Sequence, residues 1–155
     1  MSTEDNKAIA RRLYEEVWNK GNVAAVDELI APNYVDHFHY PANVLVPAEY
    51  QLSLEQIKQI VSHFRTTFPD FHYTVELQVA EGDLVVTRLT ARGTHTGEYR
   101  GLMYKGIPPT GKLVTWTYTA IVRIVDGKIV EQWSNGDDLG RLKQIGALPT
   151  TGQAS

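Results

Sequence analysis

Residues 112–135 read KLVTWTYTAIVRIVDGKIVEQWSN, a pattern on which the assignment of the fold class rests. An alternation of period two between 112 and 125 predicts a long β-strand. Its more apolar side carries Val114, Trp116, Tyr118, Ala120, Val122 and Ile124. Asp126-Gly127 is a hairpin turn signal whose twist matches two paired strands. The next strand is predicted to place on one face Ile129, Glu131, Trp133 and Asn135. The sequence leaves open which face of 112–125 points inward.

The same period of two appears in residues 71–79 and 84–95, whereas the chain before residue 70 follows a helical period. Helices are predicted from Thr3 or Glu4 to Lys20, over about 22–30, and from Ser53, where Ser53-x-x-Gln56 forms a capping box. Helices followed by a run of strands indicate an α+β fold with a sheet curled around the N-terminal helices. The long segments 36–52 and 96–111 are expected to be binding loops.

Length, net charge and cysteine content limit the classes of function that this chain can have. The chain has 155 residues, a net charge of -3 and no cysteine. We expect one domain over 1–148 and a disordered tail over 149–155. The charge disfavours nucleic acid and membrane surfaces as partners, and the charged N-terminal stretch predicts a cytoplasmic protein without a targeting segment. The remaining chemistry has to come from carboxylates, histidines, tyrosines and hydroxyls.

Two motifs have a plainer explanation than the cofactor they suggest. Residues 106–112, GIPPTGK, approach a phosphate-binding loop, but Leu113 replaces the hydroxyl and two prolines remove amides, so we expect a turn between strands. His37 and His39 alternate on an extended segment, but a catalytic metal needs about three protein ligands, so a pair that hydrogen-bonds a ligand or the backbone is favoured. We therefore expect neither metal nor cofactor.

The segment 133–146, WSNGDDLGRLKQIG, offers a candidate catalytic base. If the strand continues past Asn135, Asp137 shares the face of Trp133, where an aromatic wall would raise the pKa of its carboxyl. The alternative is that Asp137 or Asp138 caps the helical turn 139–145, a common use of aspartate. A cap that faces away from the cavity would favour a binding protein over an enzyme.

Other candidates come from histidine and the aromatic residues. His95 ends the apolar face of its strand and is either a ligand donor or a hydrogen-bonded histidine at the rim. The aromatic content exceeds what packing needs, so part of it is expected to line a site for a flat apolar ligand. The expected substrate-binding residues are Tyr14, Trp18, Phe38, Phe64, Phe68, Met103, Trp116, Tyr118 and Trp133.

Five motifs in order resemble the SnoaL-like polyketide cyclase family over about residues 5–148. They are Tyr34-Val-Asp-His37, Gly93-Thr-His-Thr-Gly97, the 106–111 turn, Asp126-Gly-Lys-Ile129 and the Glu131–Gly146 pattern. The resemblance implies the cone-shaped α+β barrel of the nuclear transport factor 2-like superfamily, with association through the sheet as homodimers or higher oligomers. It also implies ring closure without metal or cofactor. The family's acid/base aspartate falls on Asp137, and its early Asp-His pair falls on Asp36 and His37. The segment 38–52 is longer and more apolar than the family's linker.

The leading hypothesis is an enzyme of isomerase or lyase type in which Asp137 removes a proton next to a carbonyl of an apolar, oxygenated small molecule. His37, His95 and Tyr118 are the candidate donors for the enolate oxygen. The first alternative is a non-catalytic protein of the same fold that binds a small molecule. The second is an association module with an empty or collapsed pocket.

Overall fold

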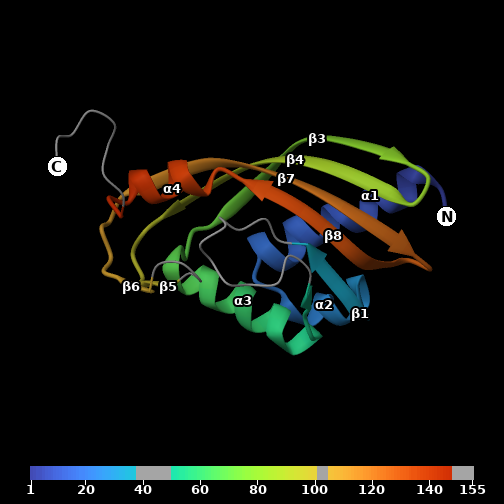
Figure 1. Cartoon of the computed structure of the whole chain (residues 1–155), viewed down its shortest axis with the longest axis horizontal. Helices are drawn as coiled ribbons and strands as arrows, with labels where there is room; N and C mark the ends of the chain where they lie inside the picture. The colour runs from blue at the N-terminus through green and yellow to red at the C-terminus, as the bar shows by residue number, and fades with distance from the viewer. Residues whose placement is uncertain (38–49, 101–104, 148–155) are drawn as a thin grey trace.

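The computed structural model describes residues 1–37, 50–100 and 105–147 (Figure 1). A curved sheet of six strands arches over the helices, in the order β2-β1-β8-β7-β4-β3. Its strands are β1 (Ile30–His37), β2 (Tyr50–Gln51), β3 (His72–Glu81), β4 (Leu84–Thr94), β7 (Leu113–Val125) and β8 (Lys128–Gly136). The pairing of β1 with β8 is parallel and the other pairings are antiparallel. The expected α+β fold with a sheet curved around the helices is confirmed, and the sheet is mixed.

Helices α1, α2 and α3 lie under the concave face of this sheet, and α4 lies at one end of it, against β7 (Figure 1). Their bounds are α1 (Thr3–Arg12), α2 (Val26–Leu29), α3 (Leu54–Thr67) and α4 (Asp138–Gln144). The capping box of α3 is confirmed: Ser53 Oγ accepts from the Gln56 amide at 3.1 Å, and Gln56 Oε1 accepts from the Ser53 amide at 2.9 Å. Among the helices of the described residues, none has the length and apolar character needed to cross a membrane.

The first helix has the predicted extent but not a uniform geometry. It continues from α1 as a π-helix over Leu13–Asn19, followed by a short 3₁₀-helix over Val23–Ala25. Asn19 joins the end of the π-helix to edge strand β3, because its side chain accepts from the Tyr73 amide at 2.7 Å and donates to the Tyr73 carbonyl at 2.9 Å. Tyr14 and Trp18 are thereby fixed against the sheet.

The hairpin of β7 and β8 turns at Asp126 and Gly127, both with positive φ, as expected for this signal. The Trp116 side of β7 is the inner face, where Val114, Ala120 and Val122 are completely buried. The outer face carries its threonines. Buried and more exposed side chains alternate along β7, in agreement with the predicted period of two.

Register shifts overturn two predicted faces. Between Val75 and Leu77 the pairing of β3 with β4 slips by one residue, so Leu77 and Val79 point outward instead of sharing the face of Tyr73. A similar shift leaves Ile129 paired with inward Ile124 but Glu131 paired with Arg123. Glu131 and Trp133 therefore face outward. A bulge reverses side-chain direction without changing composition, so alternation alone does not reveal it.

The segment 96–111 is also more regular than expected, because its described part contains β5 (Tyr99–Arg100) and β6 (Lys105–Ile107) as an antiparallel pair. Residues 106 and 107 of the motif end β6, and residues 108–112 link it to β7, so the motif joins two strands as expected. Most of the other expected loop, and the tail, lie outside the described residues.

Candidate active site

A buried carboxyl, Asp36, stands on the inner face of β1. Its residue is 3% exposed, and β1 aligns it with Gln132 on the parallel neighbour β8. The Tyr34 hydroxyl donates to Asp36 Oδ2 at 2.7 Å, and Gln132 Nε2 donates to the same oxygen at 3.4 Å. Asp36 Oδ1 is buried and has no hydrogen-bond partner among the described residues. One oxygen is held in place by two donors, and the other accepts no hydrogen bond from the described residues.

Burial raises the pKa of Asp36 to about 6, and the Tyr34 hydroxyl, the nearby His37 and Gln132 only partly oppose this effect. Desolvation penalises the charged form of a carboxyl, so its proton affinity rises. A carboxyl with a pKa near the working pH can both take up and return a proton, which is what general acid/base catalysis requires. Asp36 therefore has the chemical character expected of a catalytic base.

The raised pKa of Asp36 makes stability fall as the pH rises. The folded carboxyl holds its proton up to about pH 6, whereas the unfolded one loses it near 3.8, so the contribution of Asp36 to stability is greatest below 3.8 and decreases between 3.8 and 6. Asparagine cannot ionise, so above pH 6 we expect the free energy of unfolding of Asp36→Asn to exceed that of the wild type by about 2 to 3 kcal/mol. The two should differ little at pH 4. Urea unfolding at several pH values measures this.

The control for that series is Asp27→Asn, which removes an exposed carboxylate paired with Lys58 at 2.8 Å. Exposed pairs contribute about 0 to 1 kcal/mol, so this variant should not change the shape of the pH profile. A difference between Asp36→Asn and the wild type that stays constant from pH 4 to 8 would contradict the raised pKa.

Tyrosines of the π-helix and of the inner face of the sheet extend this polar cluster; Tyr14, Tyr34 and Tyr73 are buried, and Tyr118 is half-buried. Burial raises the pKa values of Tyr14, Tyr34, Tyr73 and Tyr118, so their hydroxyls remain protonated donors. The charges of both Asp36 and Asp138 raise the pKa of Tyr118 further, which places its phenol within electrostatic range of the two carboxylates. Neutral hydroxyls in a dry interior are suitable donors for a developing enolate oxygen.

Asp137 lies elsewhere, at the N-terminus of α4. Its Oδ1 accepts from the Gly140 amide at 2.9 Å, and the residue is exposed. The cap, which was the alternative from the sequence, is the observed arrangement. The aromatic wall of Trp133 is not beside it, because Trp133 points to the outer face.

The three predicted catalytic residues are not brought together. His37 is on the outer face, where its ring stacks on Trp133 at 4.9 Å and its Nε2 lies 2.7 Å from Glu131 Oε2. His95 is buried at the end of the inner face of β4, with Nδ1 2.9 Å from Thr110 Oγ1. Burial lowers the pKa of His95, so the neutral ring is favoured. His95 alone of the three shares the interior with the tyrosines.

Apart from Trp133, the predicted substrate-binding aromatics that the structure describes form one ring network. Trp18 contacts Phe64 at 5.8 Å between ring centres, and Phe68 contacts Trp116 at 5.5 Å. Tyr73 links Tyr14 and Tyr118, each at 5.8 Å. Trp133 is outside this network, and Phe38, Met103 and His39 lie outside the described residues.

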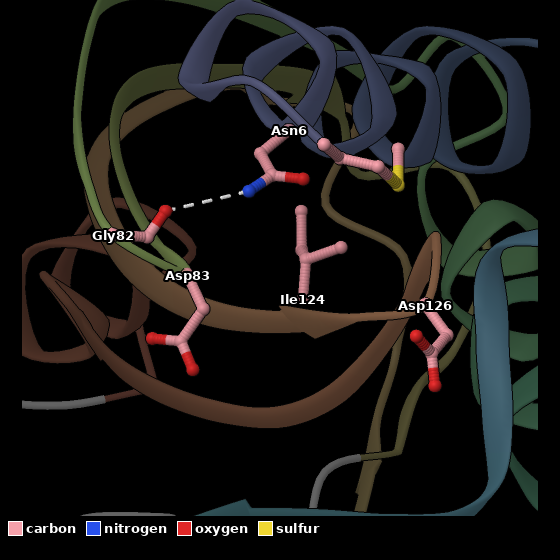
Figure 2. Close-up of a pocket in the computed structure, with 6 residues that line it drawn as sticks. Asn6, Gly82, Asp83, Ile124 and Asp126 are labelled. Atoms are coloured by element: carbon pink, nitrogen blue, oxygen red, sulfur yellow. Dashed lines mark hydrogen bonds between the residues drawn. The ribbon is translucent and has the colours of Figure 1, made fainter.

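A pocket of about 360 Å³ lies beside the start of α1, next to the turn between β3 and β4 and the turn between β7 and β8 (Figure 2). It is lined by Met1, Asn6, Gly82, Asp83, Ile124 and Asp126. Asn6 points between the strands and donates to the Gly82 carbonyl at 3.5 Å. The lining contains none of the predicted site residues.

The model of the SnoaL-like polyketide cyclase family matches residues 8–145. The chain belongs to that family. It is similar to nogalonic acid methyl ester cyclase of Streptomyces nogalater, with 30% identity over 132 residues, 83% of this chain and 89% of that protein.

Two solved structures of Streptomyces proteins extend the likeness to the fold. Wild-type IdmH from Streptomyces antibioticus, described as a candidate polyketide cyclase, has 34% identity and a TM-score of 0.73, with 91% of this chain and 98% of that one covered. AclR from Streptomyces galilaeus, described as a candidate hydroxylase, has 28% identity and a TM-score of 0.76, with 96% and 100% covered. The SnoaL-like architecture expected from the sequence is thereby confirmed.

Two residues of the interior were not among the predicted site residues. Asp36 was placed only in the family's Asp-His pair, although the inward period of β1, with Tyr34 and Asp36 both buried, could have marked it. Arg141 on α4 turns its guanidinium onto the Trp116 ring at 5.2 Å. It follows Asp138 by one helical turn, but no sequence pattern indicated that it would point inward.

Proposed function

We propose that this SnoaL-like chain is a cofactor-independent cyclase that closes a ring in an apolar, oxygenated substrate. The observation that carries the proposal is Asp36, a buried carboxyl with a raised pKa and one oxygen without a partner among the described residues. The family match supports the reaction class. Such chemistry needs only a base, a donor and a site that excludes water.

In the proposed reaction, Asp36 takes a proton from the carbon next to a carbonyl. The resulting carbanion forms a carbon–carbon bond to a second carbonyl carbon of the same molecule, whose π bond breaks to give an alkoxide. The proton then returns from Asp36 to that oxygen, so substrate and product have the same mass. Tyr118 and His95 are the proposed donors to the enolate oxygen. Asp137, which the family resemblance implies, is the rival base.

The test uses nogalonic acid methyl ester, the compound in the curated relative's name, and its free acid. We expect the purified chain to convert at least one of them into an isomer of unchanged mass, seen by liquid chromatography with mass spectrometry and by NMR. Boiled protein is the control. No conversion of either compound, in conditions where the Streptomyces nogalater enzyme is active, would contradict the proposal.

A second function is supported by the cap at Asp137. A SnoaL-like protein that only binds a small molecule would keep this aspartate as a helix cap. In that case the same two compounds would bind, as calorimetry would show, but would be recovered unchanged.

We also propose a homodimer formed through the outer face of the sheet. This face exposes apolar side chains that a lone subunit would leave in water: Leu77 is 53%, Val79 59% and Leu113 55% exposed. Such patches are typical of association surfaces. We expect the wild type to be a dimer by light scattering, and Leu77→Lys to shift it toward monomer.

The matched control for the dimer is Leu139→Lys. Leu139 is similarly exposed, at 57%, but lies on α4 and not on the outer face. It should leave the mass unchanged. A wild type that is monomeric at all concentrations tested would contradict the proposed dimer.

A further inference from the structure

Arg141 occupies an unusual place for a charged side chain. It rises from α4, which packs on β7, and its guanidinium lies over three rings: Trp116 at 5.2 Å, Tyr99 at 5.7 Å and Phe64 at 5.9 Å. Only 14% of the side chain is exposed. Aromatic faces attract a cation and shield it from water, so the charge is held in a largely dry environment.

The hydrogen bonds of Arg141 use only part of its donor capacity. Nη2 donates to Tyr99 Oη at 3.0 Å, and the same nitrogen forms an ion pair with Asp138 Oδ1 at 3.0 Å. Nε is buried and has no hydrogen-bond partner among the described residues. A guanidinium has five N–H donors in a planar fork that matches both oxygens of a carboxylate. A buried N–H without a partner calls for an explanation.

The counter-ion of Arg141 is held loosely. The Asp138 side chain is 58% exposed and reaches the guanidinium at its solvent edge, through one nitrogen. An exposed carboxylate exchanges readily with another anion, since its ion pair contributes little. The exchange would bring a ligand beside Trp116 and Tyr99, where a flat ring could pack on the aromatic side chains.

We propose that Arg141 is a binding residue for a carboxylate carried on a flat, apolar ligand, and that the ligand's carboxylate displaces Asp138. This deepens the proposed function, on which it rests, by naming a free acid as the preferred substrate class of the same interior. It concerns recognition alone, so it is measured by binding without turnover.

The test compares anthraquinone-2-carboxylate with its methyl ester by isothermal titration calorimetry. The wild type should bind the acid at least tenfold more tightly than the ester. Arg141→Met keeps the length of the side chain but removes the charge, so it should abolish the preference by weakening acid binding at least tenfold. Its affinity for the ester should change less than threefold.

Asp138→Asn gives an independent test that does not depend on how Arg141→Met folds. Removal of the competing carboxylate should tighten acid binding at least threefold and leave ester binding unchanged. The matched control is Arg123→Met, since Arg123 also lies over a ring, that of Trp133 at 5.7 Å, but on the outer face. This variant should retain the wild-type preference.

Three results would overturn the inference: equal affinity of the wild type for acid and ester, no binding of the acid at 1 mM, or weaker acid binding by Asp138→Asn. None of these results depends on ring closure. Loss of turnover with an intact acid preference would instead reject the proposed function alone.

Discussion

Replacement of Asp36 by asparagine is expected to lower the rate of ring closure by about 10²- to 10⁴-fold, the usual contribution of a general base. Asparagine has nearly the same shape and can still accept the Tyr34 hydroxyl, but it cannot take up the substrate's proton. The loss should fall mainly on kcat. In the wild type, kcat/KM should increase as the pH rises through about 6, because Asp36 must be ionised to act as the base.

The comparison of Asp36→Asn with Asp137→Asn shows which of the two carboxyls is the base. Asp137→Asn should retain the helix cap, since asparagine caps about as well as aspartate, and our geometry predicts only a small change in rate. Asp27→Asn serves as the matched control with an exposed carboxyl. If Asp137→Asn loses the activity and Asp36→Asn retains it, the base is Asp137, as the family resemblance implies, and our assignment is wrong.

The largest expected effect on stability is at Gly97. A Cβ at this position would lie 2.0 Å from the Thr66 carbonyl oxygen and 2.8 Å from its carbon, both backbone atoms. The Gly97 amide also donates to the Thr67 carbonyl at 3.0 Å, so the two segments cannot separate without loss of this bond. We expect Gly97→Ala to reduce the free energy of unfolding by about 3 kcal/mol, the upper range for overpacking.

Gly82→Ala is the control for that measurement. Gly82 has a positive φ but no atom within 4 Å of an added Cβ, so it reports the backbone strain of alanine without a collision. That strain costs about 1 to 2 kcal/mol. Thermal and urea unfolding should rank Gly97→Ala below Gly82→Ala, and the reverse order would show that the chain near Gly97 relaxes easily.

Most of the architecture was predictable because it rests on local signals. The capping box at Ser53, the turn at Asp126-Gly127 and the alternation in β7 each involve neighbouring residues. The inward face of β7 could not be decided, since threonines and apolar residues both fit a sheet face. The direction of Trp133 was predicted incorrectly for another reason: the register shift depends on how β8 pairs with β7, here Arg123 with Glu131, and alternation along one strand does not show it.

The candidate site was less predictable, since it depends on contacts between distant segments. Asp36 meets Gln132 only because β1 enters the sheet parallel to β8. Arg141 meets Tyr99 only because α4 folds back onto β7. Motifs indicated which residue types were present, but not which carboxyl would be buried.

The parallel pairing of β1 with β8 has a consequence for how the site assembles. The hairpins of β3, β4, β7 and β8 join segments close in sequence, whereas Asp36 and Gln132 are 96 positions apart. Contacts between residues so far apart in sequence form slowly, because closing the large loop between them costs conformational entropy. A chain still emerging from the ribosome lacks the C-terminal strands, so its Asp36 stays in water as an ordinary acid. The proposed base thus acquires its reactivity only when the last part of the sheet has been synthesised.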